Sequence, residues 1–159
     1  MKRIILIALS LLAAISLLTA CSGGASGGEF KFKSGDIEIK LGGDMADVLS
    51  ALGDPVDYDE STSCAFDGLD KVYKYNGFEI KTYPDKDKDY VLSITILNDT
   101  VETLEGITIG SSEADIKKAY GDDFEAIGDG MIYTKGKTKL QIIVRNGAAT
   151  SVKYEAIVD

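Results

Sequence analysis

The sequence contains no histidine and no tryptophan, and only two of its 159 residues are cysteine. Without histidine the chain lacks the most common general base and the most common zinc ligand. It also lacks a Walker-type phosphate loop and a G-x-S-x-G nucleophile turn. We therefore expect no cofactor and no bound metal, and the composition speaks against an enzyme.

Basic residues are scarce as well, with 17 Lys and Arg against 26 Asp and Glu. Loss of Lys2 and Arg3 with an export signal would leave 15 basic residues and a net side-chain charge of −11. Binding to nucleic acid needs a basic surface, so this composition predicts no nucleic-acid partner. It also argues against a folded part that lies flat on anionic lipid.

The N-terminus has the pattern of an export signal. Lys2 and Arg3 precede an apolar run over residues 4–18, which is short for a membrane-spanning helix. The run ends in Leu-Thr-Ala-Cys at residues 18–21, which resembles the lipobox of bacterial lipoproteins. That resemblance implies cleavage after residue 20 and acylation of Cys21, with the mature protein anchored in the cell membrane and facing outside the cytoplasm. Residues 21–28 would be the lipidated cysteine and its Gly/Ser tether.

With Cys21 acylated, Cys64 is the one remaining cysteine and has no partner for an internal disulfide. A reactive thiol needs a base or a nearby cation to form the thiolate, and histidine is absent. We therefore expect Cys64 to be a small buried apolar residue.

The sequence contains an internal repeat. Residues 41–54 align with residues 109–122 at an offset of 68, with six identities in fourteen positions. Each copy predicts one short helix: Asp44 and Ser112 are N-cap residue types, and Gly53 and Gly121 fit the position just after the last turn. Acidic residues in the first turn suit the helix dipole.

Three strand signals follow each helix. In the first copy they are residues 71–75, 78–83 and 90–97, and in the second they are residues 131–134, 139–144 and 150–157. Residues 30–32 and 37–39 predict an additional small hairpin. The alternating charges of residues 85–89 favour a solvated hairpin turn over a calcium loop, because an EF-hand would need Gly and Glu at later fixed positions.

The predicted fold class is α+β. We expect a tandem repeat of a short helix plus three antiparallel strands, forming one curved antiparallel sheet with the helices on one face. The domain would span residues 29–159, with repeat one at about 36–98 and repeat two at about 104–159. Neither copy alone is long enough to bury a substantial core.

The helix that closes in Gly53-Asp54-Pro55, and again in Gly121-Asp122, resembles the helices of the β-lactamase-inhibitor-protein fold and of small lipoproteins of the SmpA/OmlA type. Residues 63–84 and 105–110 are also similar to uncharacterised clostridial lipoproteins. The inhibitor resemblance implies that a partner protein binds across the concave sheet. We therefore expect a protein-binding module with an unknown partner; an envelope assembly or scaffold lipoprotein is the alternative, and an unrecognised enzyme comes third.

Tyrosines are the candidate partner-binding residues. In the strand at 78–83, Phe78, Ile80 and Thr82 share the more apolar side, so Tyr83 is expected on the open side. Tyr73 and Tyr75 share one side of the preceding strand, and the pattern does not settle which. They either form a cluster with Tyr83 on the open side or fill the core.

Replacement of Cys21 tests the lipoprotein prediction. We expect Cys21→Ala to leave an unlipidated precursor, because this thiol is the atom that would accept the diacylglycerol. Metabolic labelling with a fatty acid measures this directly. Equal labelling of the variant and the wild type would contradict the prediction.

Overall fold

The computed structural model describes residues 28–158. The predicted export signal at 1–20, the predicted lipidation site Cys21, residues 22–27 of the tether and Asp159 lie outside the described residues.

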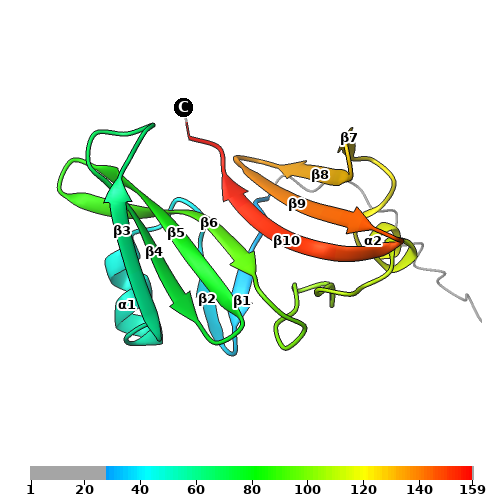
Figure 1. Cartoon of the computed structure of the whole chain (residues 1–159), viewed down its shortest axis with the longest axis horizontal. Helices are drawn as coiled ribbons and strands as arrows, with labels where there is room; N and C mark the ends of the chain where they lie inside the picture. The colour runs from blue at the N-terminus through cyan, green and yellow to red at the C-terminus, as the bar shows by residue number, and fades with distance from the viewer. Residues whose placement is uncertain (1–27, 159) are drawn as a thin grey trace, which may run out of the picture.

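Residues 28–158 form two short helices and ten strands (Figure 1). The helices are α1 (Met45–Leu52) and α2 (Glu113–Tyr120). The strands are β1 (Phe32–Ser34), β2 (Ile37–Ile39), β3 (Asp57–Thr62), β4 (Leu69–Tyr75), β5 (Phe78–Asp85), β6 (Lys88–Ile96), β7 (Glu125–Ile127), β8 (Gly130–Lys135), β9 (Thr138–Arg145) and β10 (Ala148–Ala156).

Eight of these strands make one sheet in the spatial order β3-β4-β5-β6-β10-β9-β8-β7, and every neighbouring pair is antiparallel. β6 and β10 meet at the centre, where Ile94 lies opposite Tyr154 and Ile96 opposite Val152. Four strands therefore lie on each side of the β6–β10 boundary. This confirms the predicted α+β class with an antiparallel sheet.

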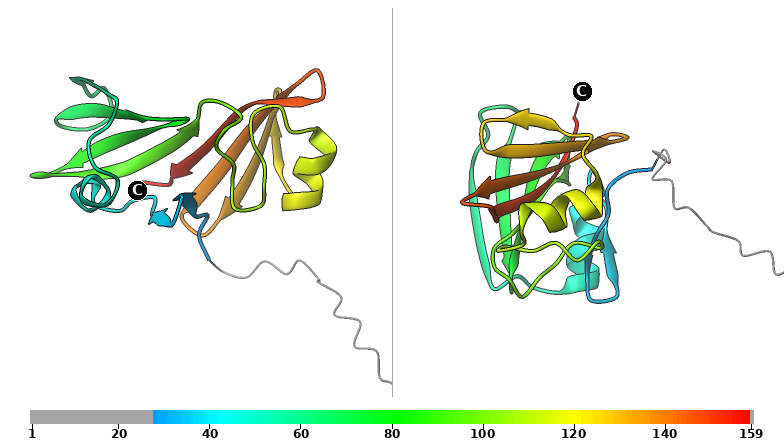
Figure 2. Two further views of the ribbon diagram at one scale, coloured as in Figure 1. Left: turned by 90° about the horizontal axis from the view of Figure 1, so that it is seen from below. Right: turned by 90° about the vertical axis from the view of Figure 1, so that its right-hand side faces the viewer.

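Both helices and the β1–β2 hairpin lie on the same side of the large sheet (Figure 2). We call the opposite side the open face. It carries the side chains that alternate with the buried ones along each strand, such as Lys81 and Tyr83 on β5, Thr95 on β6 and Gln141 on β9.

The core lies between the sheet and the helices. Ile80, Ile94, Leu140 and Ile142 are fully buried there, and they come from three strands of the sheet, β5, β6 and β9. Phe78, Ile80 and Thr82 are all buried, which confirms the side predicted for the strand at 78–83. Apolar side chains at every second position of adjacent strands therefore form one continuous layer.

The predicted helix ends are confirmed. The Asp44 carboxylate accepts a hydrogen bond from the backbone N–H of Ala46 at 3.0 Å, and the Ser112 hydroxyl accepts one from Asp115 at 3.1 Å. Both C-cap glycines, Gly53 and Gly121, have positive φ, a conformation that favours glycine. These caps satisfy backbone groups that helices of only eight residues could not pair internally.

A tyrosine from the sheet holds the end of each helix. The Tyr75 hydroxyl on β4 donates to the carbonyl oxygen of Gly53 at 3.1 Å. The Tyr133 hydroxyl on β8 donates to the carbonyl oxygen of Gly121, also at 3.1 Å. Each contact ties the last turn of a helix to the sheet, and it satisfies a carbonyl group that has left the helical hydrogen-bond pattern.

The number of strands after each helix was wrong in the sequence prediction, because each helix is followed by four strands and not three. The missed strands are β3 and β7, the two edges of the sheet. Every residue of both is exposed, so neither has the alternation of apolar and polar residues that signals a strand. They form because their backbones pair with β4 and β8.

The β6–β10 pairing predicts that residues 28–158 unfold in one transition. We expect Ile94→Ala to lower the free energy of unfolding by about 2–5 kcal/mol, because it removes a fully buried side chain at this boundary. Amides of β4 and β8 should lose protection together in hydrogen exchange. Thr95→Ala, which changes the neighbouring open-face position, should cost less than about 1 kcal/mol. Two separate calorimetric transitions would contradict one cooperative unit.

Candidate partner-binding face

The structure separates the three candidate tyrosines. Tyr73 is only 7% exposed and lies opposite Ile80, on the side of the sheet that carries the helices. Tyr75 lies opposite Phe78 on that same side and stacks on it with ring centroids 5.2 Å apart. Tyr83 follows the buried Thr82 and therefore points to the open face. A cluster of Tyr73, Tyr75 and Tyr83 on one face is thus wrong, and Tyr83 alone remains at the predicted place.

Two other aromatic residues contact Tyr83. Tyr90 lies directly opposite it across the β5–β6 pair, with ring centroids 5.7 Å apart. The ring centroid of Phe66, from the loop between β3 and β4, lies 5.2 Å from that of Tyr83. The interplanar angles are 31° and 33°, so the three rings follow one another with only modest tilts. We call Phe66, Tyr83 and Tyr90 the aromatic cluster.

The β3–β4 loop places Phe66 in this cluster. The Ser63 hydroxyl oxygen accepts hydrogen bonds from the backbone N–H groups of Ala65 (3.3 Å) and Phe66 (3.1 Å). The backbone N–H of Ser63 donates to the carbonyl oxygen of Gly68 at 3.0 Å, which closes the loop. A serine side chain that bonds backbone groups two and three residues later is a common local turn.

Asp70 on β4 lies next to the cluster. Its Oδ2 pairs with the Lys81 ammonium at 3.1 Å on the open face. Its Oδ1 is buried and has no hydrogen-bond partner. Burial favours the neutral acid, but stabilisation of the charged carboxylate by the nearby Ser63 and Lys81 side chains outweighs it and holds the pKa of Asp70 below its usual value. The carboxylate is therefore charged at neutral pH, with one oxygen that lacks a donor.

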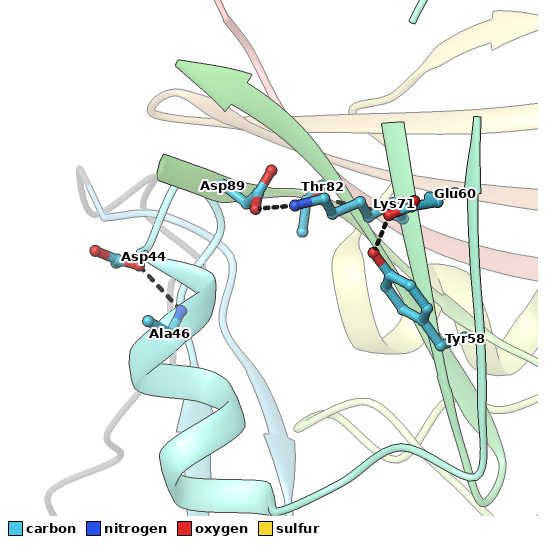
Figure 3. Close-up of polar contacts among 7 residues, drawn as sticks. All are labelled: Asp44, Ala46, Tyr58, Glu60, Lys71, Thr82 and Asp89. Carbon is cyan, nitrogen blue, oxygen red and sulfur yellow. Dashed lines mark hydrogen bonds and ion pairs between the residues drawn. The ribbon is translucent and has the colours of Figure 1, made fainter. Parts of the chain in front are cut away.

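A second set of polar side chains lies on the opposite side of the sheet, beyond the N-terminal end of α1 (Figure 3). The Lys71 ammonium pairs with Asp89 at 2.7 Å, and the Tyr58 hydroxyl donates to Glu60 at 2.6 Å. The hydrogen bond to Glu60 is the main cause that raises the pKa of Tyr58. Each group in this set has a partner: the Lys71–Asp89 pair links β4 to β6, and the Tyr58–Glu60 bond lies within β3, so we interpret the set as structural.

Asp57 and Asp59, two carboxylates close together in the sequence, lie on the exposed edge strand β3. Asp57 pairs with Lys74 at 2.8 Å, and hydrogen bonding to this lysine is the main cause that lowers the Asp57 pKa. An ion-paired carboxylate of low pKa is a poor general acid or base at neutral pH. The segment considered as a calcium loop is a tight turn, with Lys88 opposite Asp85.

Cys64 is exposed in the β3–β4 loop, so the expectation that it is a buried apolar residue was wrong. Loop residues follow no alternating pattern from which burial could be read. Its position two residues from Phe66 gives the candidate face a natural thiol for labelling.

Two further properties hold for residues 28–158. No helix there has the length and apolar character needed to cross a membrane. No three side chains among their Cys, Asp and Glu residues gather in an arrangement that could hold a metal ion.

Comparisons with known proteins do not assign this chain to a family. No protein-family model matches the chain, and the search of curated proteins gives no match. A crystal structure of a DUF4309 family protein (YjgB) from Bacillus subtilis subsp. subtilis str. 168 is similar over 71% of this chain and 78% of that chain. The two are 17% identical, and the TM-score is 0.42. A similarity of this degree does not establish a shared family.

Urea denaturation distinguishes the two kinds of tyrosine. We expect Tyr73→Ala to cost about 3 kcal/mol or more, because it removes a large ring from the core. Tyr83→Ala should cost about 1 kcal/mol or less, since its ring lies on the open face. Similar losses in the two variants would place Tyr83 among the residues that hold the fold together.

Proposed function

We propose that this protein is a membrane-anchored extracytoplasmic lipoprotein that binds a partner protein through the open face of its sheet. The observation that carries the proposal is the aromatic cluster of Phe66, Tyr83 and Tyr90 on a sheet face that neither α1 nor α2 covers. Tyrosine offers a large apolar ring and a polar hydroxyl at low cost in side-chain entropy, and for this reason it is frequent in protein interfaces.

The position of the first described residues fits an anchor at Cys21. The Phe30 backbone N–H donates to the Thr138 hydroxyl at 2.8 Å, and the Phe30 ring packs near Tyr120 and Tyr154. The first described residues therefore lie against the β8–β9 turn. The seven residue-to-residue steps from Cys21 to residue 28 would reach at most roughly 25 Å when fully extended. A lipid at Cys21 would hold the domain close to the membrane surface.

We also propose that the two halves are tandem repeats of one unit, as in the families that the sequence resembles. Matching backbone contacts support this. The Gly42 N–H donates to the Val91 carbonyl at 2.7 Å, and the Gly110 N–H donates to the Ala149 carbonyl at 2.8 Å. Gly42 and Gly110 occupy equivalent positions at the offset of 68. The matching contacts of Tyr75 with Gly53 and of Tyr133 with Gly121 also support a repeat.

The asymmetry between the halves supports a site in the first one. The rings of the aromatic cluster belong to β5, β6 and the β3–β4 loop. The corresponding hairpin of the second half, β9–β10, closes through Asn146 and Gly147, with Arg145 opposite Ala148. The aromatic residues thus distinguish one copy from the other, as expected where only one copy binds a partner.

Photo-crosslinking in cells tests the proposal with the lipid anchor in place. A photoreactive amino acid at Tyr83 or Thr95 should trap a defined protein, because both positions lie on the open face. The matched control is Ser50, an exposed position on α1. Cross-links from Ser50 with none from Tyr83 and Thr95 would contradict binding through the open face. Normal folding of each labelled protein is checked by its resistance to protease.

A further inference from the structure

We propose that the partner inserts a lysine or arginine side chain beside Asp70, against the rings of Tyr83 and Tyr90. The inference rests on the proposed function of the open face and specifies the chemistry of the partner. Three features of the described structure support it: the ring faces, the incomplete pairing of Asp70, and the construction of the loop that covers it.

The first feature is the aromatic cluster itself. A cation is attracted to the face of an aromatic ring, and the attraction grows when water is excluded. The rings of Tyr83 and Tyr90 lie side by side on the open face, and Phe66 extends the row. Asp85 is close enough to Tyr83 to contribute to the upward shift of the Tyr83 pKa, although burial is the main cause.

The second feature is the carboxylate of Asp70. Lys81 occupies Oδ2 at 3.1 Å, whereas Oδ1 is buried without a donor. A buried charged acceptor that lacks a partner is costly, so an incoming N–H donor would be favoured at this atom. Since the protein already supplies one cation here, the arriving group would complete the pairing of the carboxylate and would not have to replace Lys81.

The third feature is the loop over residues 63–68, whose Ser63 side chain interacts with Asp70 and whose Phe66 ring lies on Tyr83. Cys64, Ala65, Asp67 and Gly68 are all exposed, and the contact of Phe66 with Tyr83 joins the loop to the sheet face. Segments with few buried contacts open at low free-energy cost. A partner cation would displace Phe66 from Tyr83 and take its place over the ring, within reach of Asp70.

Peptide binding tests the inference. All described strands, both helices and the core lie within residues 28–158, so a chain that begins at Ser22 contains the whole fold. The probes are two twelve-residue Gly/Ser peptides, one with four arginines and one with four glutamates at the same positions. We expect calorimetry to detect the arginine peptide and not the glutamate peptide. Binding should weaken with salt, as it does for exposed charges.

Matched variants separate the site from general attraction to an acidic protein. Asp70→Asn and Asp36→Asn remove the same charge, but Asp36 is exposed in the turn between β1 and β2, on the helix side of the sheet. We expect Asp70→Asn and Tyr83→Leu each to weaken the arginine peptide about fivefold or more, and Asp36→Asn about twofold or less. Equal losses for Asp70→Asn and Asp36→Asn would overturn the inference. Should Asp70→Asn fail to fold, the binding of the arginine peptide to Tyr83→Leu, with Tyr58→Leu as the control, tests the inference instead.

A fluorophore on Cys64 gives a second readout, because this thiol lies in the loop that must move. The arginine peptide should change its emission, and the glutamate peptide should not. An unchanged signal at saturating arginine peptide would contradict displacement of the loop. Cross-linking from Tyr83 in cells together with failure of these peptide tests would reject the cationic ligand and keep the proposed binding face. Failure of both would reject the face as well.

Discussion

The pairing of β6 with β10 is the interaction on which the rest of the structure depends. It joins two groups of four strands through only four residue pairs, from Ser93 opposite Glu155 to Ile96 opposite Val152. The side chains of Ile94, Ile96, Val152 and Tyr154 at this boundary are all buried. Two small hydrophobic layers thereby become one. Without this boundary each half would have a helix of eight residues and a four-stranded sheet, too little to bury a stable core.

The alternation of side chains along antiparallel strands then divides the molecule into a packed side and an open side. Tyr73 and Tyr83 belong to neighbouring strands of the same hairpin, yet one fills the core and the other lies on the open face. Residue type does not explain this difference, because both are tyrosines. The register does: Tyr73 lies opposite Ile80, whereas Tyr83 lies opposite Tyr90. A search for binding residues by composition alone would therefore have combined side chains from the two faces.

The sequence was informative where local chemistry decides the structure. The N-caps Asp44 and Ser112, and the buried side of β5, follow from residue types and spacing. The edge strands β3 and β7 could not be predicted, because pairing with a neighbour and not burial stabilises them. The opposition of Tyr83 and Tyr90 could have been found by centring the β5–β6 hairpin on its turn. The contact of Phe66 with Tyr83 could not, since it depends on the path of an irregular loop.

Strand β3 has a further consequence for contact between copies of the protein. It is one of the two edge strands of the sheet, and each of its residues is exposed. Its sequence contains three carboxylates, those of Asp57, Asp59 and Glu60. Exposed strand edges invite pairing with other chains, and charged side chains oppose it. Two such edges that met would bring six carboxylates together, of which only the Asp57 pair already has a lysine partner, Lys74. The repulsion among the others would oppose edge-to-edge pairing of two copies.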